Sequence, residues 1–242
     1  KVVFSDTSLI ITALTPNQGL LKLIGKGFRK PPKKASSSRE PIESFSEMEF
    51  TYYRSSGEMH HLRESSIINP YWGIRSGYPS LLAACFAAGL ANDLSGENED
   101  EYFALCELFG SLDAKDPCLK VLRYWLKMVS CGGYLAGFTG CSRCGRNMDG
   151  ESVPYFSGKG FLCTKCRNNQ GDPQMVLTKG DLRYAEHLLE QRGLERVKLG
   201  FKVRQTLMSF LATITLHELG RPPRLLDRFR KICDNNRPIN PH

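Results

Sequence analysis

The stretch "SLIITALTPNQGLLKLIGKGF", residues 8–28, decides the architecture of the first part of the chain. Its first eight residues are mostly apolar and rich in β-branched side chains, and "PNQG" follows them. The next nine residues alternate apolar side chains around Lys22 and Gly25. A period of two is typical of a half-buried strand, and Pro, Asn and Gly favour a turn. The stretch therefore predicts two strands joined by a four-residue turn.

Two further strands are predicted downstream. "FSEMEFTYYR" (45–54) and "MHHLRESSIIN" (59–69) alternate polar and apolar residues, and "SSGE" between them predicts a second turn. Short alternating strands at a spacing of about ten residues are typical of small all-β domains. Together they predict a small closed β-barrel within the first 78 residues.

The segment between the second and third strands is basic. "RKPPKKASSSREP" (29–41) contains two adjacent prolines and three serines, which exclude a helix or a central strand and predict a long mobile loop. Flexible cations bind phosphates by displacing counterions, so we interpret the loop as a nucleic-acid-binding element, with an ordinary solvated loop as the alternative. The candidate nucleic-acid-binding residues are Lys26, Arg29, Lys30, Lys33, Lys34 and Arg39.

Aromatic residues near this loop are candidates for stacking on unpaired bases. Each one, taken alone, is explained more simply as part of a barrel core. The candidates are Phe28, Tyr52, Tyr53, Tyr71 and Trp72.

Helical patterns dominate from residue 79 onward. Ser80 after Pro79 is a predicted N-cap, Asp116 before Pro117 is another, and Gly220 ends the last predicted helix. Acidic residues open the second helix, as the helix dipole prefers. The predicted helices cover residues 79–94, 99–113, 116–133, 178–193 and 198–223.

Four cysteines form two Cys-x-x-Cys pairs with eighteen residues between the pairs. This spacing is typical of a four-cysteine zinc ribbon, because each turn directs two sulfurs at one centre. A redox pair requires a βαβ setting, which neither pair has, and structural disulfides require an oxidising compartment. Four thiolates leave no position for water, so a structural Zn²⁺ is predicted. Its ligands are Cys141, Cys144, Cys163 and Cys166.

The remaining five cysteines are scattered along the helical patterns. Nine cysteines in 242 residues are too sparse for a disulfide scaffold, and a reducing cytoplasm disfavours such bonds. We therefore interpret the five as small buried apolar residues. They are Cys85, Cys106, Cys118, Cys131 and Cys233.

The net charge of +8 is unevenly distributed. It is +6 over residues 1–40, −6 over 81–120, and +5 over both 121–167 and 168–242. This pattern indicates a polyanionic partner that meets two separate surfaces. No signal-peptide pattern and no apolar run of about 18 residues is present, so a cytoplasmic location without a membrane partner is expected.

No catalytic constellation is evident. "GKG" and "SGKG" lack the spacing of a phosphate-binding loop, and "HELG" (217–220) lacks the second histidine of a zinc-protease helix. His60 and His61 are adjacent in a strand pattern and so face opposite ways. The sequence predicts a protein that is not an enzyme.

The order of these features resembles the RecO family of bacterial recombination and repair mediators across nearly the whole chain. "SDTSLIITALTPNQGLLKLIGKGFRK" resembles the opening barrel strands of that family, including a "KG.R" run. "LKMVSCGGYLAGFTGCSRCG" resembles the helix that leads into its first cysteine pair, and "LHELGRPPRL" its C-terminal helix end.

The resemblance implies an α+β chain of two domains. These are an OB-fold at residues 1–78 and a helical domain at 79–242 that holds a zinc-binding segment at 138–170. It also implies binding to single- and double-stranded DNA, annealing of complementary strands, and loading of a recombinase together with RecR in the bacterial cytoplasm. Lys26 and Arg29 fall on the "KG.R" run.

A further implied partner is the acidic C-terminal tail of single-strand DNA-binding protein, which the family contacts through its helical domain. We expect this contact near Lys198, Lys202 and Arg204, beside Phe201. The alternatives left open are a zinc-ribbon module of transcription or translation that binds RNA, and an interaction scaffold whose basic loop meets an acidic protein.

Overall fold

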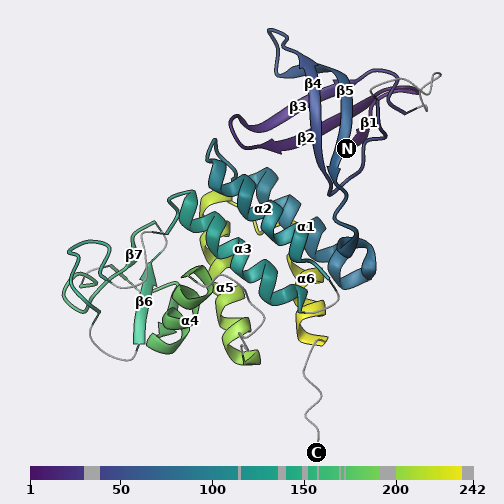
Figure 1. The fold of residues 1–242 in the computed structure, drawn as a ribbon. Coiled ribbons are helices and arrows are strands. Elements are labelled where there is room, and N and C mark those ends of the chain that lie inside the picture. Colours follow the sequence, from purple (N-terminus) through teal and green to yellow (C-terminus); the bar gives the residue numbers. More distant parts are fainter. Residues whose placement is uncertain are drawn as a thin grey trace, which may run out of the picture.

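The computed structural model describes residues 1–29, 39–113, 116–135, 140–148, 152–156, 158–168, 170–171, 173–190 and 200–235. A strand-rich N-terminal part precedes a helical body (Figure 1). The strands are β1 (Val2–Val3), β2 (Leu9–Thr15), β3 (Gly19–Gly25), β4 (Glu47–Tyr53), β5 (Met59–Asn69), β6 (Ser152–Phe156), β7 (Gly160–Phe161) and β8 (Met175–Thr178). The helices are η1 (Trp72–Ser76), α1 (Tyr78–Leu94), α2 (Glu99–Ser111), α3 (Pro117–Cys131), α4 (Lys179–Glu190), α5 (Phe201–Leu219) and α6 (Leu226–Asn235).

The N-terminal sheet has the strand order β1-β2-β3-β5-β4 and is OB-like, as predicted. β2 and β3 form the expected antiparallel hairpin, with Thr15 opposite Gly19, while β3 and β5 run parallel. Alternation along β3 buries Leu21 and Leu23 and leaves Lys22 in solvent. One face of the sheet therefore forms the small hydrophobic core that the sequence pattern predicted.

The turn before β3 lies directly against the helical body. A Cβ at Gly19 would lie 2.2 Å from the carbonyl oxygen of Gly96, in the loop between α1 and α2, and Gly19 has a φ of +57°. Both observations require glycine at this position. The hairpin turn is thus a contact point between the sheet and the helices.

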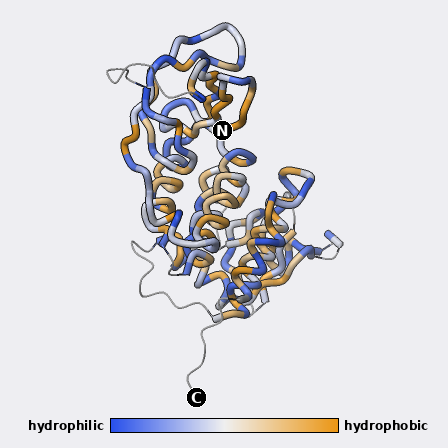
Figure 2. The backbone as a smooth tube through the Cα atoms, turned by 90° about the vertical axis from the view of Figure 1, so that its right-hand side faces the viewer, coloured by the Kyte–Doolittle hydropathy of each residue, from blue (hydrophilic) through white to orange (hydrophobic). Residues whose placement is uncertain are grey.

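α3 is the central helix of the body. Its Trp125 is fully buried, packs against Phe86 of α1 with ring centroids 5.2 Å apart, and donates a hydrogen bond from Nε1 to Thr215 Oγ1 of α5 at 3.0 Å. Phe86 also stacks on Phe229 of α6 at 4.5 Å. Figure 2 shows hydrophobic residues concentrated along the helices in the middle of the molecule. One apolar core thus joins α1, α3, α5 and α6, and it extends to α2 and α4.

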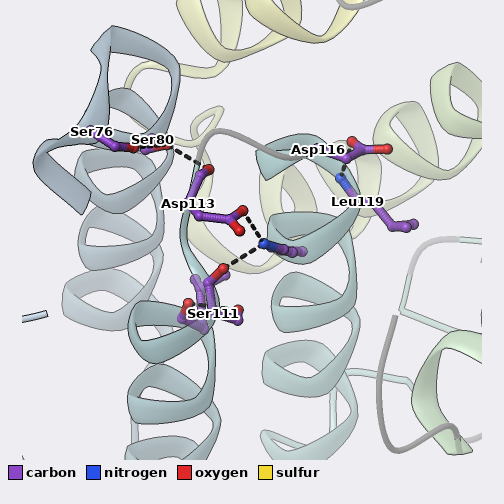
Figure 3. Close-up of polar contacts among 8 residues, drawn as sticks. Ser76, Ser80, Ser111, Asp113, Asp116 and Leu119 are labelled. Atoms are coloured by element: carbon purple, nitrogen blue, oxygen red, sulfur yellow. Dashed lines mark hydrogen bonds and ion pairs between the residues drawn. The ribbon is translucent and has the colours of Figure 1, made fainter. Parts of the chain in front are cut away.

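The helix starts confirm one predicted cap and correct another (Figure 3). Asp116 caps α3, because its Oδ1 accepts a hydrogen bond from the backbone N–H of Leu119 at 3.1 Å. Ser80 is not the N-cap of α1; the cap is Gly77, and Ser80 lies within the first turn. The buried Ser80 hydroxyl instead donates to the carbonyl oxygen of Asp113 at 2.7 Å, which ties α1 to the end of α2.

Two features of the C-terminal half were not predicted. α6 follows the helix that was expected to be the last, and three short strands pair in the order β7-β6-β8 around the cysteine segment.

The interpretation of the five scattered cysteines as buried apolar residues holds for the burial of Cys118 and Cys233, but not for their bonding and not for the other three. Cys118 and Cys233 form a disulfide that joins α3 to α6, Cys131 is exposed, and Cys85 and Cys106 are half-buried. The packing of α1 against both α3 and α6 brings the two bonded residues together across 115 positions of sequence.

Candidate metal centre and candidate nucleic-acid surface

The four predicted zinc ligands come together. The sulfur atoms of Cys141, Cys144, Cys163 and Cys166 all lie within 4.8 Å of one another, and those of Cys144 and Cys163 are 3.8 Å apart. Zinc–sulfur bonds of about 2.3 Å in a tetrahedron place sulfurs about 3.8 Å apart. The donor set and its spacing therefore fit a closed Zn²⁺ site without a position for water.

Backbone hydrogen bonds shape each cysteine pair into a tight turn. In the first, Cys141 N–H donates to Arg146 O at 2.8 Å and Gly145 N–H donates to Cys141 O at 2.8 Å, with Gly145 at a φ of +69°. In the second, the N–H groups of Cys166 and Arg167 both donate to Cys163 O at 3.0 Å. These turns are what direct both sulfurs of a pair toward one centre.

The two turns are also tied to each other. Ser142 N–H donates to Phe161 O at 2.8 Å, and Phe161 N–H donates to Ser142 Oγ at 3.1 Å. A Cβ at Gly160, whose φ is +74°, would lie 2.2 Å from that Oγ. The reciprocal pair holds the first cysteine turn beside β7, so the ligands converge even though they are far apart in sequence.

Electrostatics lower the pKa of two of the four thiols, Cys141 and Cys163, whereas the hydrogen bond with Cys144 and burial raise the pKa of Cys166. Burial alone raises the pKa of Cys141, but backbone N–H donors of Cys163, Cys144 and Arg143 outweigh it and lower that pKa to about 6. A metal ligand must be deprotonated, so a thiol with a lowered pKa suits metal binding near neutral pH.

The metal centre has a small hydrophobic cluster of its own, and the strands beside it dock on the main core. Tyr155 of β6 and Phe161 of β7 pack on Phe210 of α5, with ring centroids 5.0 and 5.5 Å apart. All three rings are buried in the core that the helices share. Sequence reasoning missed this docking because the strands that carry it are only two to five residues long.

The described cations of the predicted DNA surface lie around the end of β3. Lys26 is exposed; Arg29 donates to Ser5 O at 2.8 Å, and Arg39 donates to Arg63 O at 3.2 Å while its guanidinium lies 5.0 Å from the Phe28 ring centroid. None of these three forms an ion pair within the described residues, so their charges are available to a polyanion. Lys30, Lys33 and Lys34 lie outside the described residues.

The aromatic candidates differ in their exposure to solvent. Phe28 and Tyr71 are buried, whereas Tyr53 is 60% exposed and Trp72 is 71% exposed. The guanidinium of Arg63 lies 5.8 Å from the Tyr53 ring centroid. The sequence analysis did not single out Arg63. This residue lies two positions after His61 and therefore on the same face of a predicted strand, which is a signal that could have indicated it.

A cavity of about 530 Å³ lies between the sheet and helices α1 and α2. Glu47 of β4 stands in its wall and accepts hydrogen bonds from the hydroxyls of Tyr71, at 2.7 Å, and Tyr102, at 3.0 Å. Glu43 lies in the same wall. Its lining is largely apolar and contains none of the candidate cations Lys26, Arg29 and Arg39, so the cavity is distinct from the basic surface.

The residues expected to meet an acidic tail are only partly free. Arg204 forms a bidentate ion pair with Asp116, at 2.9 and 2.5 Å, and contributes to the packing of α5 against α3. Lys202 is exposed, and Phe201 is 36% exposed. Lys198 lies outside the described residues.

An OB-like sheet, a helical body and a four-cysteine centre docked on that body together define a class of two-domain proteins with a candidate metal site. In the part of the chain that the structure describes, no helix is long and apolar enough to cross a membrane.

Family models place the chain within this class. The model described as Recombination protein O N terminal matches residues 1–71, and that described as Recombination protein O C terminal matches residues 75–227. The chain therefore belongs to the RecO family of DNA repair proteins, as its sequence predicted.

Curated relatives carry the name DNA repair protein RecO. The protein of Rubrobacter xylanophilus is 27% identical over 75% of this chain and 74% of its own length. That of Thermodesulfovibrio yellowstonii is 26% identical over 91% of this chain and 90% of its own. That of Caldicellulosiruptor saccharolyticus is 20% identical over 96% of this chain and 94% of its own.

Proposed function

We propose that the chain is a non-enzymatic mediator of recombinational DNA repair. In this proposal it binds single- and double-stranded DNA through the basic end of its OB-like sheet and anneals complementary strands. With RecR it helps to load recombinase onto coated strands. The observation that supports this most directly is the group Lys26, Arg29 and Arg39 at the end of β3, whose charges no acidic side chain among the described residues neutralises.

The proposed mechanism is electrostatic. Cations that contact two strands lower the repulsion between their phosphates, so complementary bases can meet without any covalent step. The Zn²⁺ at Cys141, Cys144, Cys163 and Cys166 would supply folding energy and rigidity only. The proposed boundary between the domains stays at residues 78 and 79, and the proposed location is the bacterial cytoplasm, where the DNA is.

The acidic tail of single-strand DNA-binding protein is the proposed recruiting partner. Lys202 and Phe201, which lie together at the start of α5, offer one cation and one partly exposed ring for such a tail. Contact there would bring the annealing protein to strands that are already covered.

The test is the annealing of complementary DNA strands pre-coated with single-strand DNA-binding protein, using zinc-replete protein. We expect annealing faster than with the coat alone, and we expect salt to abolish the acceleration. Stronger binding to structured RNA than to single-stranded DNA would instead favour an RNA-binding module. Weak binding to both nucleic acids even at low salt would favour an interaction scaffold.

Three charge variants test the proposed surface. Lys26→Gln should weaken DNA binding, whereas Lys22→Gln should change it less, because Glu58 already pairs with Lys22 at 3.2 Å. Reversing Lys30, Lys33 and Lys34 together should both weaken binding and flatten its salt dependence. An unchanged salt slope in the triple variant would remove the loop from the proposed surface.

A further inference from the structure

The two cysteine turns of the metal centre repeat one short pattern. In the first, Cys141 and Cys144 enclose Ser142 and Arg143; in the second, Cys163 and Cys166 enclose Thr164 and Lys165. Each turn thus carries a hydroxyl followed by a cation. A further cation follows each pair, Arg146 after the first and Arg167 after the second. The pattern places four cations around one metal centre.

These four cations are exposed. Arg143, Arg146, Lys165 and Arg167 form no ion pair and donate no side-chain hydrogen bond within the described residues. The described part of the segment contains no Asp or Glu, since Asp149 and Glu151 lie outside it. We call this group the knuckle cations.

Some cations of the helical body are paired with acids. Arg123 and Lys127 both pair with Glu107, at 2.6 and 2.5 Å, and Arg221 pairs with Asp93 at 2.7 Å. The exposed cations of α6 form no such pair among the described residues, but they alternate with Asp227 and Asp234 along that helix. The described part of the metal segment has no acidic side chain among its four cations, so its positive charge is more concentrated.

A simpler role for these cations is to offset the charge of the thiolates. Backbone groups already perform this role in part, because N–H groups of Cys163, Cys144 and Arg143 hydrogen-bond to the Cys141 sulfur. The side chains themselves remain in solvent. Their charge is therefore available to an external anion as well as to the metal centre.

The position of the metal segment in the molecule indicates which kind of anion its cations would bind. Figure 1 shows the hairpin β6–β7 and the OB-like sheet at opposite ends of the molecule, with α1, α2 and α3 between them. A protein with one basic surface at each end can hold two points of a polyanion, or two polyanions, at once. This inference rests on the proposed function, in which two DNA strands are brought together.

We propose that the knuckle cations are a second nucleic-acid contact, which binds the phosphate backbone of a second strand while the OB-like sheet holds the first. The contact is independent of base sequence, because the exposed groups are phosphate-binding cations without an aromatic partner among the described knuckle residues. A bound Zn²⁺ would fix the two cysteine turns, and with them these four exposed cations, relative to each other.

The test is the capture of a second strand. An immobilised oligonucleotide is saturated with zinc-replete protein, and a labelled non-complementary strand is added, so base pairing makes no contribution. The variant R143Q/R146Q/K165Q/R167Q should capture at least fivefold less of the second strand and bind the first strand within twofold of wild type. Its salt slope for second-strand capture should fall by about 2 to 3, since each single-strand phosphate contact contributes about 0.7.

A matched control removes the same charge elsewhere. R183Q/R224Q/R228Q/K231Q neutralises four exposed cations on and around α4 and α6, and capture should stay within twofold of wild type. Zinc content of each variant is measured first. If the knuckle variant loses zinc, R146Q/R167Q, which leaves both Cys-x-x-Cys turns intact, provides the same comparison with at least a twofold loss expected.

The outcomes separate this inference from the proposed function. Undiminished capture by the zinc-loaded knuckle variant overturns the inference while DNA binding by the sheet stands. Loss of binding to an acidic peptide, with capture of the second strand unchanged, also overturns it and assigns the cations to a protein partner. Wild-type protein that binds no DNA at all overturns the proposed function and the inference together.

Discussion

At the scale of single residues, Asp116 performs two tasks that most residues perform separately. Its carboxylate caps α3 through Leu119 and holds Arg204 of α5 in a bidentate pair. It does so at a φ of +41°, a left-handed conformation that Asp and Asn tolerate better than other side chains. The sequence predicted the cap, because Asp precedes Pro, but the ion pair depends on how α5 lies.

We expect Asp116→Ala to lower the free energy of unfolding by about 2–4 kcal/mol, because it removes both the cap and the carboxylate that forms a bidentate pair with the largely buried Arg204. Asp116→Asn should cost about half as much, since Asn keeps the cap and the backbone conformation. Urea unfolding measures both. Asp113→Asn, which removes a more exposed carboxylate, serves as the control, with an expected cost below about 1 kcal/mol. Equal effects of Ala and Asn at Asp116 would contradict the double role.

Glu101 makes the free energy of unfolding depend on pH. It is buried near the start of α2, and burial raises its pKa above the ordinary value of 4.5, although the N–H of Gly96 donates to it at 2.8 Å. A pKa that is raised in the folded state favours the protonated carboxyl group. The contribution of Glu101 to the free energy of unfolding is therefore fully present below pH 4.5, and it is lost as the pH rises through the folded-state pKa.

Glu101→Gln should therefore match wild type near pH 4 and become progressively more stable than wild type as the pH increases. The measurement is urea unfolding of both proteins from pH 4 to pH 8. Curves that run parallel over this range would show that Glu101 does not titrate differently in the folded and unfolded chains.

At the scale of elements, the three-stranded sheet β6–β7–β8 connects the metal centre to the helical core through Tyr155, Phe161 and Phe210. Removal of the metal should therefore destabilise the whole helical body and not only the cysteine turns. We expect chelation to lower the melting temperature by several degrees in one transition, and added zinc to restore it. Hydrogen exchange should rise in α5 as well as in β6. An unchanged α5 would show that the segment folds independently of the body.

The sequence predicted the elements whose patterns are long and local. The hairpin β2–β3 alternates over seven-residue strands, and α3 has a cap, a proline and terminal glycines to define its ends. The cysteine cluster was predictable because ligand chemistry fixes the spacing of the pairs regardless of what lies between them. These parts depend on residues within one turn or one strand of each other.

The remaining parts depend on contacts between distant segments. α6 has only ten residues, mostly polar, and is held by Phe229 stacking on Phe86 and by Cys233 bonding to Cys118. Ser80 is a residue type that often caps helices. However, Tyr78 and Pro79 already belong to α1, so Ser80 lies within the helix and its hydroxyl donates to the carbonyl oxygen of Asp113. Such features follow from packing, which a local pattern does not contain.

At the scale of the whole molecule, Glu47 links the sheet to the helices. It lies on β4 and accepts hydrogen bonds from Tyr71, just before η1, and from Tyr102 of α2. Burial and this carboxylate raise the pKa of both tyrosines, so both hydroxyls stay protonated and keep donating across the physiological range. The link is therefore insensitive to pH around neutrality.

Glu47→Ala should loosen the two parts, because it removes the carboxylate that accepts hydrogen bonds from two partly buried hydroxyls, at a cost of about 1–3 kcal/mol each. We expect faster proteolysis at residues 70–77 and separate unfolding of sheet and helices. Glu49→Ala, two residues along the same strand and exposed, is the matched control and should change neither.

If annealing requires basic surfaces at both ends of one rigid molecule, Glu47→Ala should slow annealing more than it weakens binding of a short single strand. Equal losses in both assays would show that the two surfaces act independently.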